Sequence, residues 1–490
     1  MKISLAKDTF FYSLSSWGQK LLSVVLAPVT IAYFSPNDFG YLMLVNTIAS
    51  FLFILGMLAV ADQGLPRFFI DSSSEQDKKE YIASTMIITL AGNIFMILVV
   101  FLCVPFISII FKDIENPLVF AFLVSAICFT QSYSYLGNNL LRWTFQSPLF
   151  TKINLIKSAV SVSIAIIGIV FLEWRVKQTI LLTIVLNFLA GTWSNYAVRE
   201  YMNISLLSSQ KIKELLAYSW PLLGLNIFSF FTLSLDRVLL ARLSNLHDLG
   251  IYSVSTTIAS LFETATAGFF AATAPYFLAT YKETWAPKRY AEYFTILSAV
   301  GVVSIVCLGL WGAPVISLLR RDGTYREIGI YIPWILTGSV LYYLGAYFAP
   351  GPYIQKKTYF SFIAFVLSTI VNVALCLFLI PSYGLLGCGV AVTISSLVSA
   401  VFNQFVSNRL FSIPNKWIRS FSMILGMALV TSILQHRISP FNINDYPLII
   451  RALVTIILLI AGIIPFYRDI ETADAADKAV AWFRSKLSFT

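Results

Sequence analysis

Charged residues are scarce in this sequence, and that scarcity excludes most classes of soluble protein. Only 12% of its 490 residues are charged, whereas 58% are hydrophobic, and a water-soluble protein carries about twice that share of charge. Histidine occurs twice, as His247 and His436, both in polar stretches between apolar runs. The sequence has neither a glycine-rich phosphate loop nor an H-E-x-x-H motif, so the common soluble enzyme sites are not indicated.

Cysteine is also sparse, and its five residues form no recognisable site. None belongs to a C-x-x-C pair or to a His/Cys spacing typical of metal binding, and their odd number argues against a disulfide framework. All lie within apolar runs: Cys103, Cys128, Cys307, Cys376 and Cys388. We therefore expect small packing residues, with no metal site and no cofactor.

Long apolar runs occur from one end of the chain to the other, and the mean hydropathy is +0.79. A helix that crosses the hydrocarbon needs about 20 residues, because every backbone polar group must be bonded within it. The runs predict an all-α integral membrane protein with about fourteen transmembrane helices. The predicted spans lie near residues 11–34, 41–61, 82–111, 117–141, 151–172, 179–198, 214–241, 250–281, 291–318, 331–350, 358–380, 385–407, 418–435 and 448–467.

The net charge of +10 is explained by the orientation of the chain in the membrane. Lys and Arg concentrate in alternate connections, which is the positive-inside pattern. It predicts cytoplasmic N- and C-termini and makes a nucleic-acid partner unnecessary. Two cations, Lys20 and Arg237, are expected inside spans.

One internal repeat is visible in the sequence. "DFGYLMLVNTIAS" (38–50) and "DLGIYSVSTTIAS" (248–260) share six of thirteen residues at a constant offset of 210. Each copy begins the second span of a six-span block, and an even number of spans gives the two halves the same direction. This pattern favours a parallel repeat of two lobes, as transporters use. The alternative is that D-x-G is a generic helix start and the other matches are chance.

The stretch "LIPSYGLLGCGVA" (379–391) predicts a membrane hairpin. Pro381 ends one span at the membrane surface, since proline cannot continue a helix. Gly384 and Gly387 then begin the next span, where small side chains permit close backbone contact.

Charges inside the apolar spans are the candidate functional residues, because a charge in the bilayer core is costly. Lys20 lies near the middle of the first span and is interpreted as a substrate-binding cation or as a paired structural lysine. Glu263 lies near the middle of the eighth span. It suits proton or cation coupling, and it equally suits neutralisation of a base. Asp236 and Arg237 end the seventh span, and Arg67 follows the second, where each is also compatible with an ordinary interfacial charge.

Two segments resemble one known family. "LDRVLLARLSNLHDLGIYSVSTTIAS" is similar to the D-R…G-x-Y-S segment of bacterial polysaccharide flippases, and "NVALCLFLIPSYGLLGCGVAVTISS" resembles their I-P-x-Y-G-x-x-G hairpin. "FSPNDFGYL" and "GLPRFF" are similar to the family's N-terminal pattern. The family transfers O-antigen or capsule repeat units and belongs to the multidrug/oligosaccharidyl-lipid/polysaccharide exporter superfamily.

The resemblance implies a fold and an activity. The expected fold has an N-terminal six-helix lobe (1–205) and a C-terminal six-helix lobe (206–410) around a central cavity. Two accessory transmembrane helices (411–467) and a cytoplasmic tail (468–490) follow. The expected activity is non-enzymatic: alternating access moves an undecaprenyl-diphosphate-linked oligosaccharide across the bacterial inner membrane.

The resemblance also implies a binding site and partners for this protein. Lys20, Arg67 and Arg237 are expected to bind the diphosphate, since a lipid diphosphate needs cationic partners in a wet cavity. Glu263 and Asp236 are expected to couple an ion. The partners implied are the lipid-linked oligosaccharide, membrane lipids, a glycan polymerase and a chain-length regulator.

Three alternatives stay open. A drug/cation antiporter of the same superfamily would need acids and aromatics around its substrate, and Lys20 counts against it. A membrane-embedded glycan polymerase or ligase would be an enzyme with a sizeable outer domain. The longest outer connections, near 319–330 and 436–447, are too short for such a domain. A peptidoglycan-precursor flippase shares the physical features on which the polysaccharide-flippase hypothesis is based.

Overall fold

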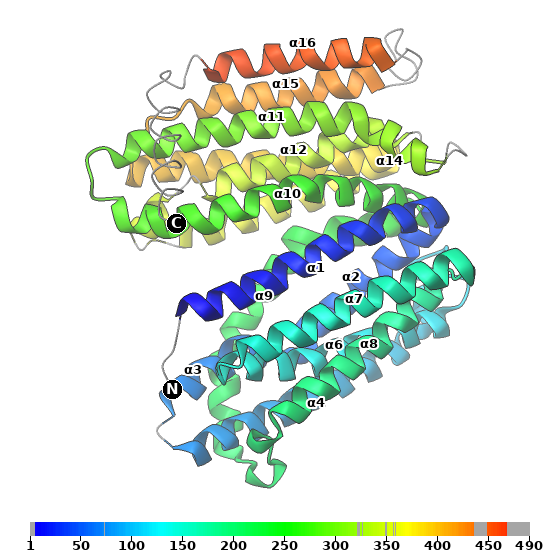
Figure 1. Ribbon diagram of the computed structural model, residues 1–490, viewed down its shortest axis with the longest axis vertical. Helices are drawn as coiled ribbons and strands as arrows, with labels where there is room; N and C mark the ends of the chain where they lie inside the picture. The colour runs from blue at the N-terminus through cyan, green and yellow to red at the C-terminus, as the bar shows by residue number, and fades with distance from the viewer. Residues whose placement is uncertain are drawn as a thin grey trace, which may run out of the picture. The chain divides into compact units, whose positions relative to one another are not determined.

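The computed structural model describes most of the chain as helices packed into two compact units, Met1–Gly250 and Ile251–Thr490 (Figure 1). The described residues are 5–72, 74–320, 324–325, 327–347, 350–355, 357, 359–435 and 448–467, and within them no strand occurs. The predicted tail 468–490 and His436 lie outside these residues. The all-α prediction is confirmed.

The N-terminal unit is built around pairs of long helices. α1 packs on α7, α6 packs on α8, and α2 contacts α4, α6 and α9; α1 and α7 are seen side by side in Figure 1. Its elements are α1 (Leu5–Tyr33), α2 (Pro36–Met57), the π-helix η1 (Val60–Gly64), α3 (Leu65–Asp71), α4 (Glu75–Leu102), α5 (Val104–Ile110), α6 (Pro117–Trp143), α7 (Ser147–Phe171), α8 (Val176–Ala197), η2 (Arg199–Tyr201), η3 (Ile204–Leu206) and α9 (Ser209–Leu243).

The C-terminal unit is a second helical bundle. α11 packs on α12, α15 and α16, and α12 packs on α14; α15 is drawn beside α11 in Figure 1. Its elements are α10 (Leu246–Thr280), whose first turn belongs to the N-terminal unit, α11 (Ala286–Leu319), α12 (Ile328–Tyr347), α13 (Gly351–Ile354), α14 (Tyr359–Leu410), α15 (Trp417–Gln435) and α16 (Leu448–Tyr467).

Eleven helices of the described chain are long and apolar enough to cross a membrane. One of them, α14, contains two of the predicted spans. The first and eighth predicted spans correspond to α1 and α10, which carry Lys20 and Glu263 near their middles and are not among the eleven. Each predicted span therefore has a helix, and the chain is a multi-pass membrane protein.

The predicted hairpin is the turn inside α14. Gly384 has φ 53° and ψ −131°, a conformation outside any helix, and the helical segments before and after it are joined there. Asn372 donates a hydrogen bond to Ser395 Oγ at 3.3 Å, and Ser368 Oγ donates to the Ser395 carbonyl at 3.0 Å. These bonds join residues on either side of the turn, so the two segments run antiparallel.

The two copies of the repeat begin their helices in the same way. The Ser35 hydroxyl accepts the backbone N–H of Asp38 at 3.2 Å and caps α2. At the equivalent positions, the Asn245 side chain accepts the backbone N–H of Asp248 at 2.8 Å. Ser and Asn are preferred N-caps because their oxygens satisfy an orphan N–H of the first turn. The shared cap supports the repeat over a chance match.

Candidate functional site

Lys20 is an exposed cation near the middle of the 29-residue helix α1. Gly18, two residues earlier, lies so close to α7 that an added Cβ would be 2.4 Å from Leu155 Cδ2. Two residues on an α-helix are about 200° apart around its axis, so Lys20 projects away from α7. Within the described chain, its ammonium has no hydrogen-bond or ion-pair partner. Lys20 thus lies near the middle of its helix with an ammonium that is unpaired among the described residues, and its role as a substrate-binding cation stays a prediction.

Arg67 lies on the short helix α3 and is exposed. Its guanidinium makes an ion pair with Asp71 Oδ2 at 3.0 Å, and the two side chains are 60% and 52% exposed. An exposed pair of this kind contributes little to stability and exchanges easily for another anion. Arg67 can therefore bind a phosphate if it breaks one weak ion pair, that with Asp71.

Asp236 and Arg237 lie inside α9, which continues to Leu243. Asp236 is buried, with 6% of its surface exposed. Arg237 is half-buried, and its Nε has no hydrogen-bond partner among the described residues. Both residues are thus at least partly shielded, and their roles as diphosphate-binding and ion-coupling residues stay predictions.

Glu263 belongs to the C-terminal unit and is half-buried on α10. The Ser339 hydroxyl of α12 donates to Glu263 Oε1 at 3.0 Å. This bond ties α10 to α12 and gives the carboxylate a neutral partner.

The predicted cations are not joined into one cluster. In the part of the chain that the structure describes, no hydrogen bond or ion pair links Lys20, Arg67 and Arg237 to one another. They share a unit, and they lie on three different helices, α1, α3 and α9.

Asp62 is a further acidic residue whose position is unusual. α2 ends at Met57, after which Leu58 and Ala59 adopt positive φ angles of 51° and 56°. The π-helix η1 follows and carries Asp62, and such short π segments are often found at functional sites. Asn226 of α9 donates to Asp62 Oδ2 at 3.3 Å, whereas Oδ1 is buried without a described partner.

Lys157 is a mid-span cation that the charge pattern did not single out. It lies near the middle of the 25-residue helix α7, where its ammonium donates to Asn187 Oδ1 of α8 at 3.3 Å. The expectation that only Lys20 and Arg237 lie inside spans is wrong. The available signal was its position within the predicted span 151–172.

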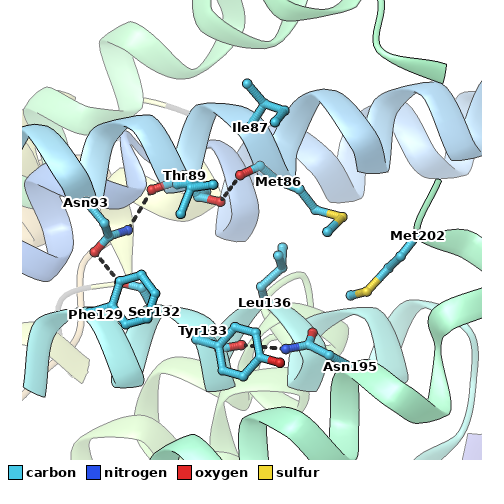
Figure 2. A pocket seen from close by; sticks show the side chains of 11 residues that line it. Met86, Ile87, Thr89, Asn93, Phe129, Ser132, Tyr133, Leu136, Asn195 and Met202 are labelled. Carbon is cyan, nitrogen blue, oxygen red and sulfur yellow. Dashed lines mark hydrogen bonds between the residues drawn. The ribbon is translucent and has the colours of Figure 1, made fainter. Parts of the chain in front are cut away.

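A cavity of about 280 Å³ lies among α4, α6 and α8 in the N-terminal unit. Figure 2 shows the hydrogen bonds of its amide groups: Asn93 donates to the Thr89 carbonyl at 2.7 Å and accepts from Ser132 at 2.8 Å, whereas Asn195 Oδ1 is buried without a described partner. Asn195 likewise donates to the Tyr133 carbonyl at 3.1 Å. The described residues around the cavity include no charged side chain. This cavity therefore offers apolar surface and no partner for a diphosphate.

Comparison with known proteins identifies a family and a fold. Residues 33–280 match the model of the polysaccharide biosynthesis protein family. A comparison with curated protein sequences finds no match.

Two solved structures of transporters are similar over most of the chain. The lipid II flippase MurJ, in its inward closed conformation, has a TM-score of 0.64 and 15% identity over 94% of this chain and 100% of its own. An inward-facing multidrug resistance transporter of the MATE family and MOP superfamily has a TM-score of 0.61 and 13% identity. It covers 84% of this chain and 95% of its own. Such likeness establishes a shared fold.

The family match extends from the last residue of α1 to the last residue of α10 and so spans half of the chain. This chain belongs to the polysaccharide biosynthesis protein family, and it has the fold of the MOP superfamily transporters.

Proposed function

We propose that this protein is a flippase for an undecaprenyl-diphosphate-linked oligosaccharide. It moves the repeat unit from the cytoplasmic to the outer leaflet of the bacterial inner membrane by alternating access. The product is then used for a surface polysaccharide, such as O-antigen, capsule or exopolysaccharide. Membership of a polysaccharide biosynthesis family and a fold shared with a lipid II flippase support this proposal.

Lys20 is the observation that carries the proposal. An exposed ammonium in the middle of a membrane helix, with no described carboxylate beside it, requires water or an anionic ligand. A lipid diphosphate supplies that anion each time a substrate crosses. A cationic drug does not, so the drug/cation antiporter is the weaker alternative.

Arg67 and Arg237 are proposed as further contacts of the diphosphate. Guanidinium groups bind phosphate oxygens through paired hydrogen bonds, and Arg67 needs only to leave its exposed pair with Asp71. The polyprenyl tail remains in lipid, so the protein has to shield only the charged and sugar portions of the substrate.

Glu263 and Asp236 are proposed as ion-coupling residues. Glu263 is a half-buried carboxylate whose described partner, Ser339, is uncharged. A carboxylate in this setting can take up a proton or a cation without first breaking a salt bridge. Coupling to an ion gradient would give the transport cycle a direction.

We place the protein in the inner membrane with both termini in the cytoplasm, as the charge pattern favours. A glycan polymerase and a chain-length regulator would act on the transported units at the outer face. The protein itself would be a transporter and not a polymerase.

The proposal is tested by the sidedness of lipid-linked oligosaccharide in inner-membrane vesicles with and without this protein. We expect completed repeat units to remain on the cytoplasmic leaflet when it is absent. Units that cross normally but fail to lengthen would indicate a polymerase instead. Cytoplasmic accumulation of peptidoglycan precursor, with normal oligosaccharide crossing, would indicate the lipid II type of substrate.

A further inference from the structure

A second cavity of the N-terminal unit, of about 210 Å³, lies between α1, α7 and α8. Lys157 and Ser161 line it from α7, Asn187 and Thr183 from α8, and Gln19 from α1. Each of these helices contributes residues from its middle part, so the cavity lies far from both ends of the helices. It is a half-open pocket in which a few polar groups lie among apolar side chains at the middle of three helices.

Lys157 is the one charged side chain among the described residues around this cavity. An ammonium has three N–H donors, and one of them is directed to Asn187 Oδ1 at 3.3 Å. No Asp or Glu in the described lining neutralises the charge. Lys157 is half-buried, and a partly desolvated cation without a counter-ion is unfavourable, so the site favours a ligand that brings a negative charge.

The remaining polar groups show where such a ligand is held. Gln19 donates to Ser15 at 3.1 Å, and Thr183 donates to the Thr179 carbonyl at 3.0 Å, so these donors are already used. Ser158 and Ser161 have no described hydrogen bond, and Ser161 is on the same face of α7 as Lys157, one turn later. The free donors thus converge from α7: the ammonium and two hydroxyls.

We propose that the cavity between α1, α7 and α8 binds a small anion, held by the Lys157 ammonium with the Ser158 and Ser161 hydroxyls. The anion is a free inorganic ion, such as chloride or orthophosphate, or the phosphate group of a lipid. The same donors serve each source, because all offer compact negative charge and hydrogen-bond acceptors. This inference concerns binding only and does not depend on the proposed transport activity.

The experiment is equilibrium dialysis of the purified full-length protein against radiolabelled chloride and radiolabelled orthophosphate. In a parallel arm, native mass spectrometry measures retention of phosphatidic acid over phosphatidylcholine. Lys157→Gln should weaken binding about 10- to 100-fold, the usual effect of removing a charge-assisted hydrogen bond. Lys152→Gln, an exposed lysine of the same helix, is the matched control and should bind as the wild type does.

Asn187→Asp gives a second test that keeps the size of the side chain. The new carboxylate would stand where the amide oxygen now lies, 3.3 Å from the Lys157 ammonium. It would supply the counter-ion internally and should exclude the anion while leaving the protein folded. This variant tests the proposal even where Lys157→Gln does not fold.

Binding of a free ion that both variants lose would support the proposal and identify an inorganic anion. Binding of phosphatidic acid alone, lost in both, would support it and identify a lipid phosphate. The proposal fails if the wild type binds none of the three probes. It also fails if binding persists unchanged in the folded Asn187→Asp protein.

Discussion

Gly40 of α2 lies against the backbone of α10, and Gly250 of α10 lies against the backbone of α2, where the first turns of the two helices cross. A Cβ added at Gly40 would lie 1.9 Å from the Leu246 carbonyl oxygen, and one added at Gly250 would lie 1.7 Å from that of Pro36. The offset of 210 residues that relates the two glycines also relates Pro36 to Leu246. The crossing is therefore reciprocal, and the repeated D-x-G motif serves both helix initiation and backbone contact.

Gly40→Ala and Gly250→Ala should each destabilise the N-terminal unit. The new methyl group would overlap a backbone oxygen that belongs to a helix, so the helices must separate, at a cost of about 1–3 kcal/mol. Thermal unfolding of the purified variants measures the effect. Gly224→Ala in α9 is the control, because its added Cβ meets nothing within 4 Å. Equal unfolding temperatures for all three variants would contradict a tight crossing.

Lys20→Ala should reduce surface glycan about 10- to 100-fold, because it removes a charge-assisted contact to the diphosphate. The exposed side chain has no described partner, so the protein should remain in the membrane at its normal level. Lys20→Arg should keep part of the activity, since it retains the cation, and Lys152→Ala should have no effect. Normal glycan at normal protein level in Lys20→Ala would remove Lys20 from the mechanism.

Arg67→Ala and Asp71→Ala separate function from stability at the exposed ion pair on α3. Each variant should lose no more than about 1 kcal/mol of stability, because both side chains of the pair are exposed. If Arg67 binds the substrate, only Arg67→Ala should lower transport, and Asp71→Ala should leave it unchanged or raise it. Vesicle sidedness assays on both variants check this. Equal loss of transport in the two would show that the pair acts structurally.

The sequence predicts the helices and the hairpin because both depend on local chemistry. Apolar runs locate the spans. The reversal within α14 occurs at Gly384, whereas Pro381, predicted to end the span, is still helical. The sequence does not predict the break in the helix after α2, because leucine and alanine rarely adopt the positive φ angles that Leu58 and Ala59 have there. Tertiary bonds stabilise it instead: Asn139 donates to the Ala61 carbonyl and Asn226 to Asp62, each at 3.3 Å.

The sequence predicts only part of the candidate site, because only some of its residues stand out by their local sequence. Lys20 is conspicuous because it lies near the middle of a predicted span, and the structure leaves it exposed. Lys157 was missed, although it lies within the predicted span 151–172, because its charge and that of Lys152 were both attributed to the charge pattern of the connections. Its described hydrogen-bond partner, Asn187, comes from another helix, α8. Partners on separate helices cannot be read from spacing along one chain.

Gly384→Ala should destabilise the C-terminal unit by about 1–3 kcal/mol, because φ 53° with ψ −131° is unfavourable for a residue with a side chain. Gly387→Ala should have an effect of similar size for a different reason: its Cβ would lie 2.4 Å from the Leu379 carbonyl oxygen. Thermal unfolding is the measurement. The exposed Ser382→Ala in the same turn is the control and should be neutral.

Glu263→Gln tests ion coupling without removing the contact between α10 and α12. The amide oxygen of glutamine can still accept the Ser339 hydrogen bond, now 3.0 Å long, so the bundle should remain folded. Only the charge is lost, and with it the capacity to take up a proton or a cation. We expect transport in vesicles to become insensitive to an imposed ion gradient. Ser339→Ala removes the hydrogen bond and keeps the charge, so its transport should still respond to the gradient. A gradient response in Glu263→Gln equal to that of the wild type would exclude this carboxylate as the coupling group and leave Asp236 to be tested in its place.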